Sequence, residues 1–518
     1  MNLDLIPESA RAAGLGALMK GAGMLTRFMP IPQPTLLVGP GSSARLGQAV
    51  AGFGHARVLI VTDAMIVKLG LLQGLTDALA AAGTPYAVFD EVTPDAPIPL
   101  IERGIAAFRD HGCDALVAVG GGSAMDAAKV IALASANPRK SLRGLAGYFK
   151  GLHSPAPVYA VPTTAGTGSE VTVAAVIADP ERKSKIVIVD TRLVPKVAAL
   201  DPALMTGLPP AITAATGMDA LTHAIEAFVG RWATASTDGL ALSAVGLIFE
   251  NLRIAYREGG NVEAREKMAL ASTYAGMAFT RANVGYVHAI AHQFGGRYHT
   301  PHGLANAIVL PHVLRFSAPA ITDRLAQLAL RARLGTEDED EEVLAERFLD
   351  GVDALNRELG IPTHLAALRE ADIPALAKAA LHEAHTGYPV PRYMTRAECE
   401  ALIRGLLPRD AAAGPEHAVV KAGSRAAAKT AAKAAAGKAT RTAAKAPAKR
   451  RARAAAAALA RRLAGALAAV LVAFPAAALA AVFAAALDPA LTTACSGPAA
   501  ASRGSRPRIS ASHSARVM

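Results

Sequence analysis

The stretch DALVAVGGGSAMDAAK, residues 114–129, decides the fold. Its opening residues 114–120 are mostly apolar and predict a buried strand. Three glycines end that strand at 120–122, and Ser123 begins a helix expected over 123–136. A glycine turn between strand and helix leaves backbone N–H groups free to bind an anion such as a pyrophosphate, although a simple tight turn gives the same pattern.

Strand and helix patterns alternate on both sides of this stretch. Further strands are expected at 57–63, 85–92, 158–164, 185–190 and 197–202, and further helices at 65–83 and 100–112. Such alternation is typical of an α/β fold with a mostly parallel sheet. Strand patterns vanish after about residue 208, so we predict an α/β domain over 31–206 and an all-α domain over 207–407.

The two ends of the chain differ from this body. Residues 1–30 predict a short amphipathic leader helix rather than a secretory signal, because Asp4, Glu8 and Lys20 interrupt any apolar run. The chain carries a net charge of +12, but residues 408–518 alone hold 18 Lys and Arg against three acids. Residues 1–407 therefore have 36 bases and 39 acids, a net charge of −3, so the overall basicity says nothing about the function of the body.

Residues 408–518 form an Ala/Lys/Arg-rich tail that we expect to be disordered, with an apolar stretch at 463–487. A DNA-binding or membrane-binding appendage is the alternative, because the spaced cations suit phosphates and the apolar stretch is long enough to span a bilayer. The three cysteines have no CxxC spacing, which suits a reducing, cytoplasmic compartment.

A second candidate nucleotide loop is PTTAGTGSE, residues 162–170, which follows another predicted strand. It combines glycines with the hydroxyls of Thr163, Thr164 and Thr167 at an edge where dinucleotides bind in such folds. Asp63 ends the strand 57–63 and is placed to accept hydrogen bonds from an adenosine ribose. Turns without a ligand are the alternative for both features.

The strongest chemical signal is a group of acidic and histidine residues at helical spacing. Asp219 and His223 are four residues apart, as are His288 and His292, so each pair shares one helix face, and His302 follows. Carboxylate and imidazole ligands suit a divalent transition metal. These five candidates exceed a four-coordinate set, so one must have another function. His299 and His312 are expected to be surface histidines.

Four motifs together resemble the iron-containing (group III) alcohol dehydrogenases. They are GGGSAMDAAK, PTTAGTGSE, ATGMDALTHAIE and VHAIAHQFGGRYHTPHGLANAIVLPH, in the order and spacing of that family. The similarity covers about residues 31–407 and is nearest to the lactaldehyde/propanediol-type and broad alcohol dehydrogenases. It implies a Rossmann-like dinucleotide-binding domain at 31–206 and a metal-binding domain at 207–407, with the active site in the cleft between them. It also implies NAD and one divalent metal, Fe(2+) ahead of Zn(2+).

The resemblance assigns roles by position. It implies the metal ligands Asp219, His223, His288 and His302 and leaves His292 as a non-ligand, which we expect to act as a catalytic proton relay. The expected cofactor-binding residues are Asp63, Gly121, Gly122, Ser123, Asp126, Thr163, Thr164, Thr167, Thr172 and Lys185. The expected reaction interconverts a primary or small alcohol and its aldehyde or ketone by hydride transfer to or from NAD.

Departures from the family pattern bear on the substrate. Ala174 stands where lactaldehyde reductases carry an Asn, which argues against a small polar hydroxy-aldehyde, and Asp95 lies in TPDAP where an Asn-Pro is frequent. A dehydroquinate-synthase or glycerol-1-phosphate-dehydrogenase-like enzyme is the rival within this architecture, but no Lys and Arg cluster for a phosphate substrate lies around 219–302. We expect a cytoplasmic homo-oligomer, a dimer or larger.

Overall fold

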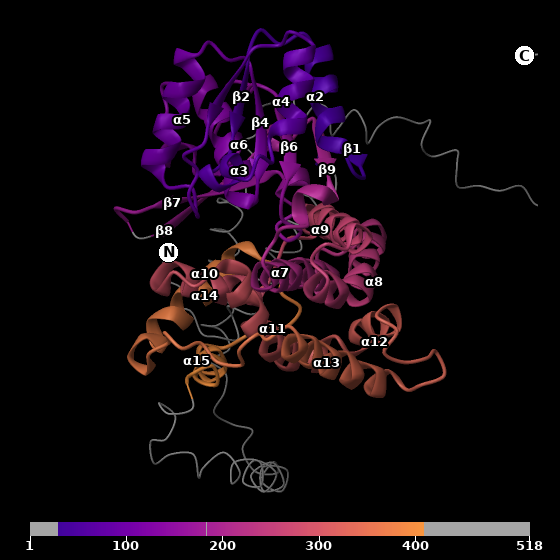
Figure 1. The fold of residues 1–518 in the computed structure, drawn as a ribbon. Helices are drawn as coiled ribbons and strands as arrows, with labels where there is room; N and C mark the ends of the chain where they lie inside the picture. The colour runs from indigo at the N-terminus through magenta and orange to yellow at the C-terminus, as the bar shows by residue number, and fades with distance from the viewer. Residues whose placement is uncertain (1–28, 183, 409–518) are drawn as a thin grey trace, which may run out of the picture. The chain divides into compact units, whose positions relative to one another are not determined.

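The computed structural model describes residues 29–182 and 184–408 (Figure 1). Residues 1–28 and 409–518 lie outside it. The expected leader helix and the expected tail with its apolar stretch 463–487 therefore fall outside the described residues.

The first half of the described chain is built on a six-stranded sheet in the order β1-β9-β6-β4-β2-β3. Its strands are β1 (Thr35–Val38), β9 (Val197–Leu200), β6 (Val158–Pro162), β4 (Ala115–Gly120), β2 (Val58–Val61) and β3 (Tyr86–Phe89). Every neighbouring pair is parallel. The predicted α/β class and mostly parallel sheet are confirmed.

Helices cover both faces of this sheet because its strands are apolar on both sides. On β4, Leu116 and Ala118 belong to the core beneath α5 (Ile98–Asp110) and α6 (Gly122–Ala136), while the alternate residues Val117 and Val119 belong to the core beneath α2 (Ser42–Gly52) and α4 (Gln73–Ala81). Because β4 ends at Gly120, the glycine turn and the start of α6 lie at the carboxyl edge of the sheet.

The structure corrects two expected elements. The single helix expected over 65–83 is divided into α3 (Ala64–Lys68) and α4, because Gly70 takes a left-handed φ of 69° between them. The strand expected at 185–190 is β8 (Ser184–Val189), which lies in a separate three-stranded sheet with β5 (Gly147–Tyr148) and β7 (Ala174–Asp179). It pairs antiparallel with β7. Because β8 is partly exposed, it suits this smaller sheet better than the centre of the large one.

The second half is helical, and from 208 to 408 the structure has no strand, as the sequence predicts. Its helices are α7 (Pro210–Val229), α8 (Ala235–Arg257), α9 (Val262–Ala282), α10 (Tyr286–Tyr298), α11 (His302–Ser317), α12 (Thr322–Arg331), α13 (Glu341–Glu358), α14 (Ile373–Gly387) and α15 (Arg396–Arg404). Among the described helices, only α8 is long and apolar enough to cross a membrane, and 44% of its most apolar window is buried within the protein. A core helix of a globular domain has the same properties.

The two halves touch where the short helix η3 (Ser169–Val171) meets α9. A Cβ on Gly168 would lie 2.7 Å from Cα of Gly276, and Gly168 has a left-handed φ of 60°. Thr273 Oγ1 on α9 donates to Glu170 Oε1 at 2.7 Å beside this contact. Backbone therefore packs directly on backbone at this junction, which only glycine allows.

Candidate active site

The two predicted nucleotide loops lie against each other, because β4 and β6 are neighbours in the sheet. Thr163 N–H donates to Gly120 O at 3.0 Å. A Cβ on Gly121 would lie 3.3 Å from Thr164 Oγ1, and one on Gly122 only 2.8 Å from Thr167 Cγ2. The structure thus brings the glycines of the first loop and the threonines of the second together at the carboxyl edge of the sheet.

Ser123 and Lys185 extend this edge. Ser123 Oγ accepts from Asp95 N–H at 3.1 Å, and Lys185 Nζ on β8 pairs with Asp95 Oδ1 at 2.9 Å. Lys185 Nζ also lies 3.9 Å from where a Cβ on Gly295 of α10 would be. The ammonium of Lys185, on the smaller sheet, therefore lies between the nucleotide loops and the helical half.

Asp63 has a structural contact in addition to its predicted role. Its Oδ1 accepts from the N–H groups of Met65 and Ile66 at 2.9 and 3.0 Å and so caps α3. Its Oδ2 lies 3.9 Å from the position that a Cβ on Gly120 would take. The carboxylate thus lies beside the glycine turn of the first nucleotide loop.

Asp126 and Thr172 face a buried lysine that the sequence reasoning missed. Lys129 Nζ lies 3.0 Å from Thr172 Oγ1 and 2.9 Å from Ser169 Oγ, while Asp126 accepts from Ser169 Oγ at 2.7 Å and from Val176 N–H at 2.9 Å. Burial lowers the pKa of Lys129 to about 8, against the attraction of Asp126. These contacts anchor the second loop to α6. Lys129 ends the quoted motif, so its position was a signal that could have been used.

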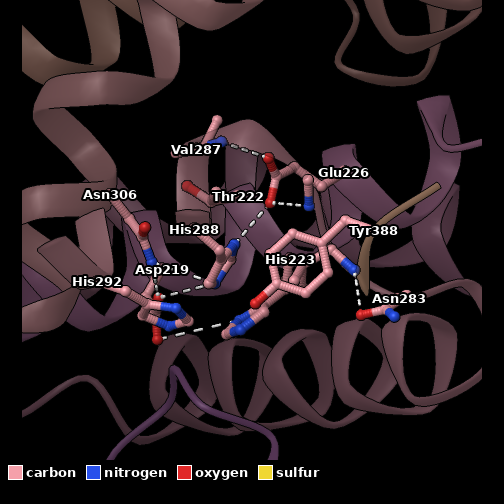
Figure 2. A network of polar contacts seen from close by, with 12 residues as sticks. Asp219, Thr222, His223, Glu226, Asn283, Val287, His288, His292, Asn306 and Tyr388 are labelled. Atoms are coloured by element: carbon pink, nitrogen blue, oxygen red, sulfur yellow. Dashed lines mark hydrogen bonds and ion pairs between the residues drawn. The ribbon is translucent and has the colours of Figure 1, made fainter. Parts of the chain in front are cut away.

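In the helical half, Asp219, His223, His288 and His302 come together from α7, α10 and α11 (Figure 2 shows the first three). Each offers one ligand atom, and these four atoms lie within 4.8 Å of one another. Asp219, His223 and His288 are buried, while the His302 side chain is 31% exposed. The four residues are the set that the resemblance implies, with one ligand at the open side of the cluster.

The imidazoles of this cluster favour their neutral form. Burial lowers the pKa of His223, and it lowers the pKa of His288 well below its usual value, with neighbouring histidines adding to the effect. Desolvation and the nearby His292 lower the pKa of His302 to about 4, against the attraction of Asp219. A neutral imidazole keeps the nitrogen lone pair that binds a metal.

Two further observations fit a cation at this cluster. His223 Nδ1 is buried without a hydrogen-bond partner among the described residues, and the nearest carboxylate oxygen, Asp219 Oδ2, is 3.9 Å away. Asn306 Nδ2 lies 2.7 Å from Asp219 Oδ1 and 3.2 Å from each of the Nε2 atoms of His288 and His302, so one amide group contacts three candidate ligand atoms. Nitrogen and oxygen donors that converge in this way suit a divalent transition metal.

His292 lies beside the cluster and outside the four ligands. Its ring stacks on His302 at 5.3 Å between centroids, and its Nδ1 lies 2.6 Å from Glu383 Oε1 on α14. Gln293 and Tyr388 also donate to Glu383, and although burial opposes them, these bonds lower its pKa. Glu383 was missed because it lies 91 residues from His292 and the sequence has no spacing signal for the pair.

The two histidines expected at the surface differ in exposure. His299 is exposed, as expected. His312 was expected at the surface, but it is only partly exposed on α11, and burial lowers its pKa. The apolar neighbours of α11 explain the difference, because most of that helix lies in the core of the helical half.

Comparisons with known proteins agree with this geometry. The family model "Iron-containing alcohol dehydrogenase" matches residues 33–202, and the C-terminal model of the same family matches residues 213–407. The chain belongs to the iron-containing alcohol dehydrogenase family. The family predicted from the four motifs is therefore confirmed.

Relatives of this chain are spread across the family. It is 42% identical to lactaldehyde reductase of Escherichia coli K12, over 68% of this chain and 93% of that one. It is 38% identical to the NAD-dependent methanol dehydrogenase of Bacillus methanolicus, over 74% of this chain and 100% of that one. The solved structure of a 1,3-propanediol oxidoreductase superposes with a TM-score of 0.70 at 39% identity, covering 73% of this chain and 100% of that one. These similarities favour an alcohol dehydrogenase over a dehydroquinate-synthase-like enzyme.

Proposed function

We propose that this iron-containing alcohol dehydrogenase homologue interconverts a primary or small alcohol and its aldehyde or ketone with NAD and one divalent metal, Fe(2+) ahead of Zn(2+). The observation that carries the proposal is the convergence of Asp219, His223, His288 and His302 within 4.8 Å. The cluster adjoins the nucleotide loops, since a Cβ on Gly166 of the second loop would lie only 2.9 Å from Thr216 O on α7, the helix that carries Asp219 and His223.

The residues of the chain divide the work of this reaction. A divalent metal at the cluster supplies Lewis acidity that lowers the pKa of an alcohol, and NAD supplies the hydride acceptor. Loops 120–123 and 163–167 bind and orient the dinucleotide with backbone N–H groups and hydroxyls. Glu383 holds Nδ1 of His292, which leaves Nε2 as the nitrogen that exchanges a proton with the substrate side.

The test of this proposal is His302→Ala. His302 is the most exposed of the four candidate ligands, so its loss should leave the fold intact while metal and alcohol oxidation disappear together. His299→Ala is the matched control, because that exposed histidine lies three residues away and should leave both unchanged. Full metal occupancy in the His302 variant would contradict the ligand assignment.

The finer parts of the proposal concern substrate and assembly. Ala174 in place of the Asn of lactaldehyde reductases supports simple alcohols over small polar hydroxy-aldehydes, which a panel of alcohols followed by NADH absorbance tests. We propose a cytoplasmic homo-oligomer, on the strength of the family. DNA or membrane contact by residues 408–518 is an alternative use of that segment, tested by salt-dependent retention on DNA and by partition into lipid vesicles.

A further inference from the structure

Glu226 is a buried carboxylate beside the metal ligands that neither the motif assignments nor the proposed reaction uses. It lies on α7 three residues beyond His223, and its side chain is 5% exposed. Its Oε2 accepts from Gly285 N–H at 2.8 Å and lies 2.6 Å from His288 Nδ1, while its Oε1 accepts from Val287 N–H at 2.7 Å (Figure 2). One carboxylate therefore collects three N–H groups from the start of α10.

These bonds replace a helix cap. The helix α10 begins at Tyr286 after Gly285, which has no side chain to accept the free N–H groups of the first turn. Glu226 supplies the acceptor from the neighbouring helix, and a carboxylate at a helix N-terminus is also favoured by the helix dipole. A Cβ on Gly285 would lie 2.8 Å from Glu226 Oε1, so the close approach of the carboxylate requires glycine there.

The same carboxylate determines the tautomer of His288. Asn306 Nδ2 lies 2.7 Å from Asp219 Oδ1, and because an ionised carboxylate only accepts, that amide atom must be the N–H₂ donor. The same Nδ2 lies 3.2 Å from His288 Nε2, so Nε2 is the acceptor and Nδ1 carries the proton toward Glu226. Within this network the Nε2 lone pair of His288 points into the ligand cluster.

We propose that Glu226 is a positioning residue of the metal site, which holds His288 in its Nδ1–H form and ties the first turn of α10 to α7. The inference rests on the proposed metal centre and deepens it. Asp219 and His223 are carried by α7 and His288 by α10, so a carboxylate that joins the two helices keeps ligands of both in register. A carboxylate behind a ligating histidine also increases the basicity of that ligand.

The experiment measures the affinity of the full-length protein for Zn(2+) alone, by competition with a chromophoric chelator. Glu226→Gln should weaken Zn(2+) binding about 10- to 100-fold, the usual effect of removing such a partner. The matched control is Glu170→Gln, which alters another buried carboxylate that bonds Thr273 away from the cluster. That control should lower stability and leave Zn(2+) affinity unchanged.

A second readout separates positioning from general stability. In ¹⁵N-histidine spectra of the Zn(2+)-loaded wild type, His288 should show a protonated Nδ1, and Glu226→Gln should disturb that signal. If Glu226→Gln does not fold, Gly285→Ala replaces it, because the added Cβ displaces the carboxylate without removing it. Unchanged Zn(2+) affinity in the folded variant, beside a tightly binding wild type, overturns the inference and leaves the proposed function standing. If the wild type binds no Zn(2+), the same comparison is made with Fe(2+), and a wild type that binds neither metal overturns both.

Discussion

At the scale of single residues, the carboxylate of Asp63 combines a structural and a proposed recognition role. It caps α3 through Oδ1 and lies beside Gly120 at the glycine turn. A substitution to glycine would remove the cap as well as the charge, and so would confuse the two effects. Asparagine keeps an oxygen for the cap and removes only the charge, so it is the better probe.

We therefore expect Asp63→Asn to narrow the preference for NAD over NADP. Repulsion between this carboxylate and a 2′-phosphate is worth on the order of 1–3 kcal/mol in a partly solvated site, or about 5- to 150-fold in the ratio of kcat/KM values. The control is Asp114→Asn, because Asp114 also binds backbone N–H groups but precedes β4 at the opposite edge of the sheet. An unchanged ratio would show that Asp63 faces away from the ribose.

Glu383 offers a second test at this scale. Glu383→Gln weakens the hold on His292 Nδ1, so kcat should fall about 10- to 100-fold with KM and metal content unchanged, part of what general acid–base catalysis contributes. Tyr388→Phe is the matched comparison, since it removes one donor to Glu383 and keeps the carboxylate on His292. A rise in KM would instead place Glu383 in substrate binding, and a loss of metal would place it in metal binding.

These partners show where sequence reasoning stops. The candidate metal site was accessible because Asp219 with His223, and His288 with His292, repeat at helical spacing, which is a local signal. The choice of four ligands from the five candidates came from the family resemblance. Glu226 contacts His288 across 62 residues and Glu383 contacts His292 across 91, so tertiary packing alone brings them together. Glu226 did leave one trace, since it follows Asp219 by seven residues and thus lies on the ligand-bearing face of α7.

At the scale of elements, Lys129 joins α6 to the second nucleotide loop. Its ammonium donates to the backbone oxygens of Ser169, Thr172 and Ala174 at 2.7, 3.1 and 2.9 Å. Burial lowers its pKa from 10.5 to about 8. Between pH 8 and pH 10.5 this lysine is protonated in the unfolded chain but has released its proton in the folded chain. Its contribution to the free energy of unfolding therefore rises with pH.

The wild type should accordingly gain stability over Lys129→Met as pH increases from about 8 toward 10. The gain is at most about 1.4 kcal/mol per pH unit in that window, and urea unfolding of both proteins across it measures the difference. Subtracting the unfolding free energy of the variant from that of the wild type cancels the contributions of tyrosines and cysteines that titrate in the same pH range. A constant difference across the window would show that Lys129 keeps its ordinary affinity for protons.

Elements with strong local patterns were predictable, and those that depend on context were not. The buried strand β4 was expected at 114–120 and lies at Ala115–Gly120, since apolar runs before a glycine turn have few alternatives. The placement of β8 failed because its partner β7 has no distinctive pattern of its own, and only pairing decides which sheet a strand joins. The break at Gly70 depends on a left-handed backbone conformation. A glycine allows this conformation but does not impose it, so the residue type alone does not predict the break.

At the scale of the whole molecule, the family match ends at residue 407, where Leu406 and Leu407 are buried in the helical core. We expect a chain that ends at Pro408 to keep its metal content, cofactor affinity and turnover. A chain that stops before Thr395 is the control, because it loses α15 and the bond from Leu365 N–H to Leu406 O, and should aggregate. If the chain that ends at Pro408 is soluble but has lost turnover, residues 409–518 take part in catalysis.

The contact between Gly168 and Gly276 limits how this enzyme can be re-engineered. A Cβ on Gly276 would lie 2.8 Å from Gly168 O, just as one on Gly168 would meet Gly276, so neither position accepts a side chain while the other backbone stays in place. Directed evolution proceeds by single substitutions and will find both positions closed. Libraries that aim to alter the coupling of the two halves should instead vary Thr273 and Thr280, whose side chains form hydrogen bonds across the same junction.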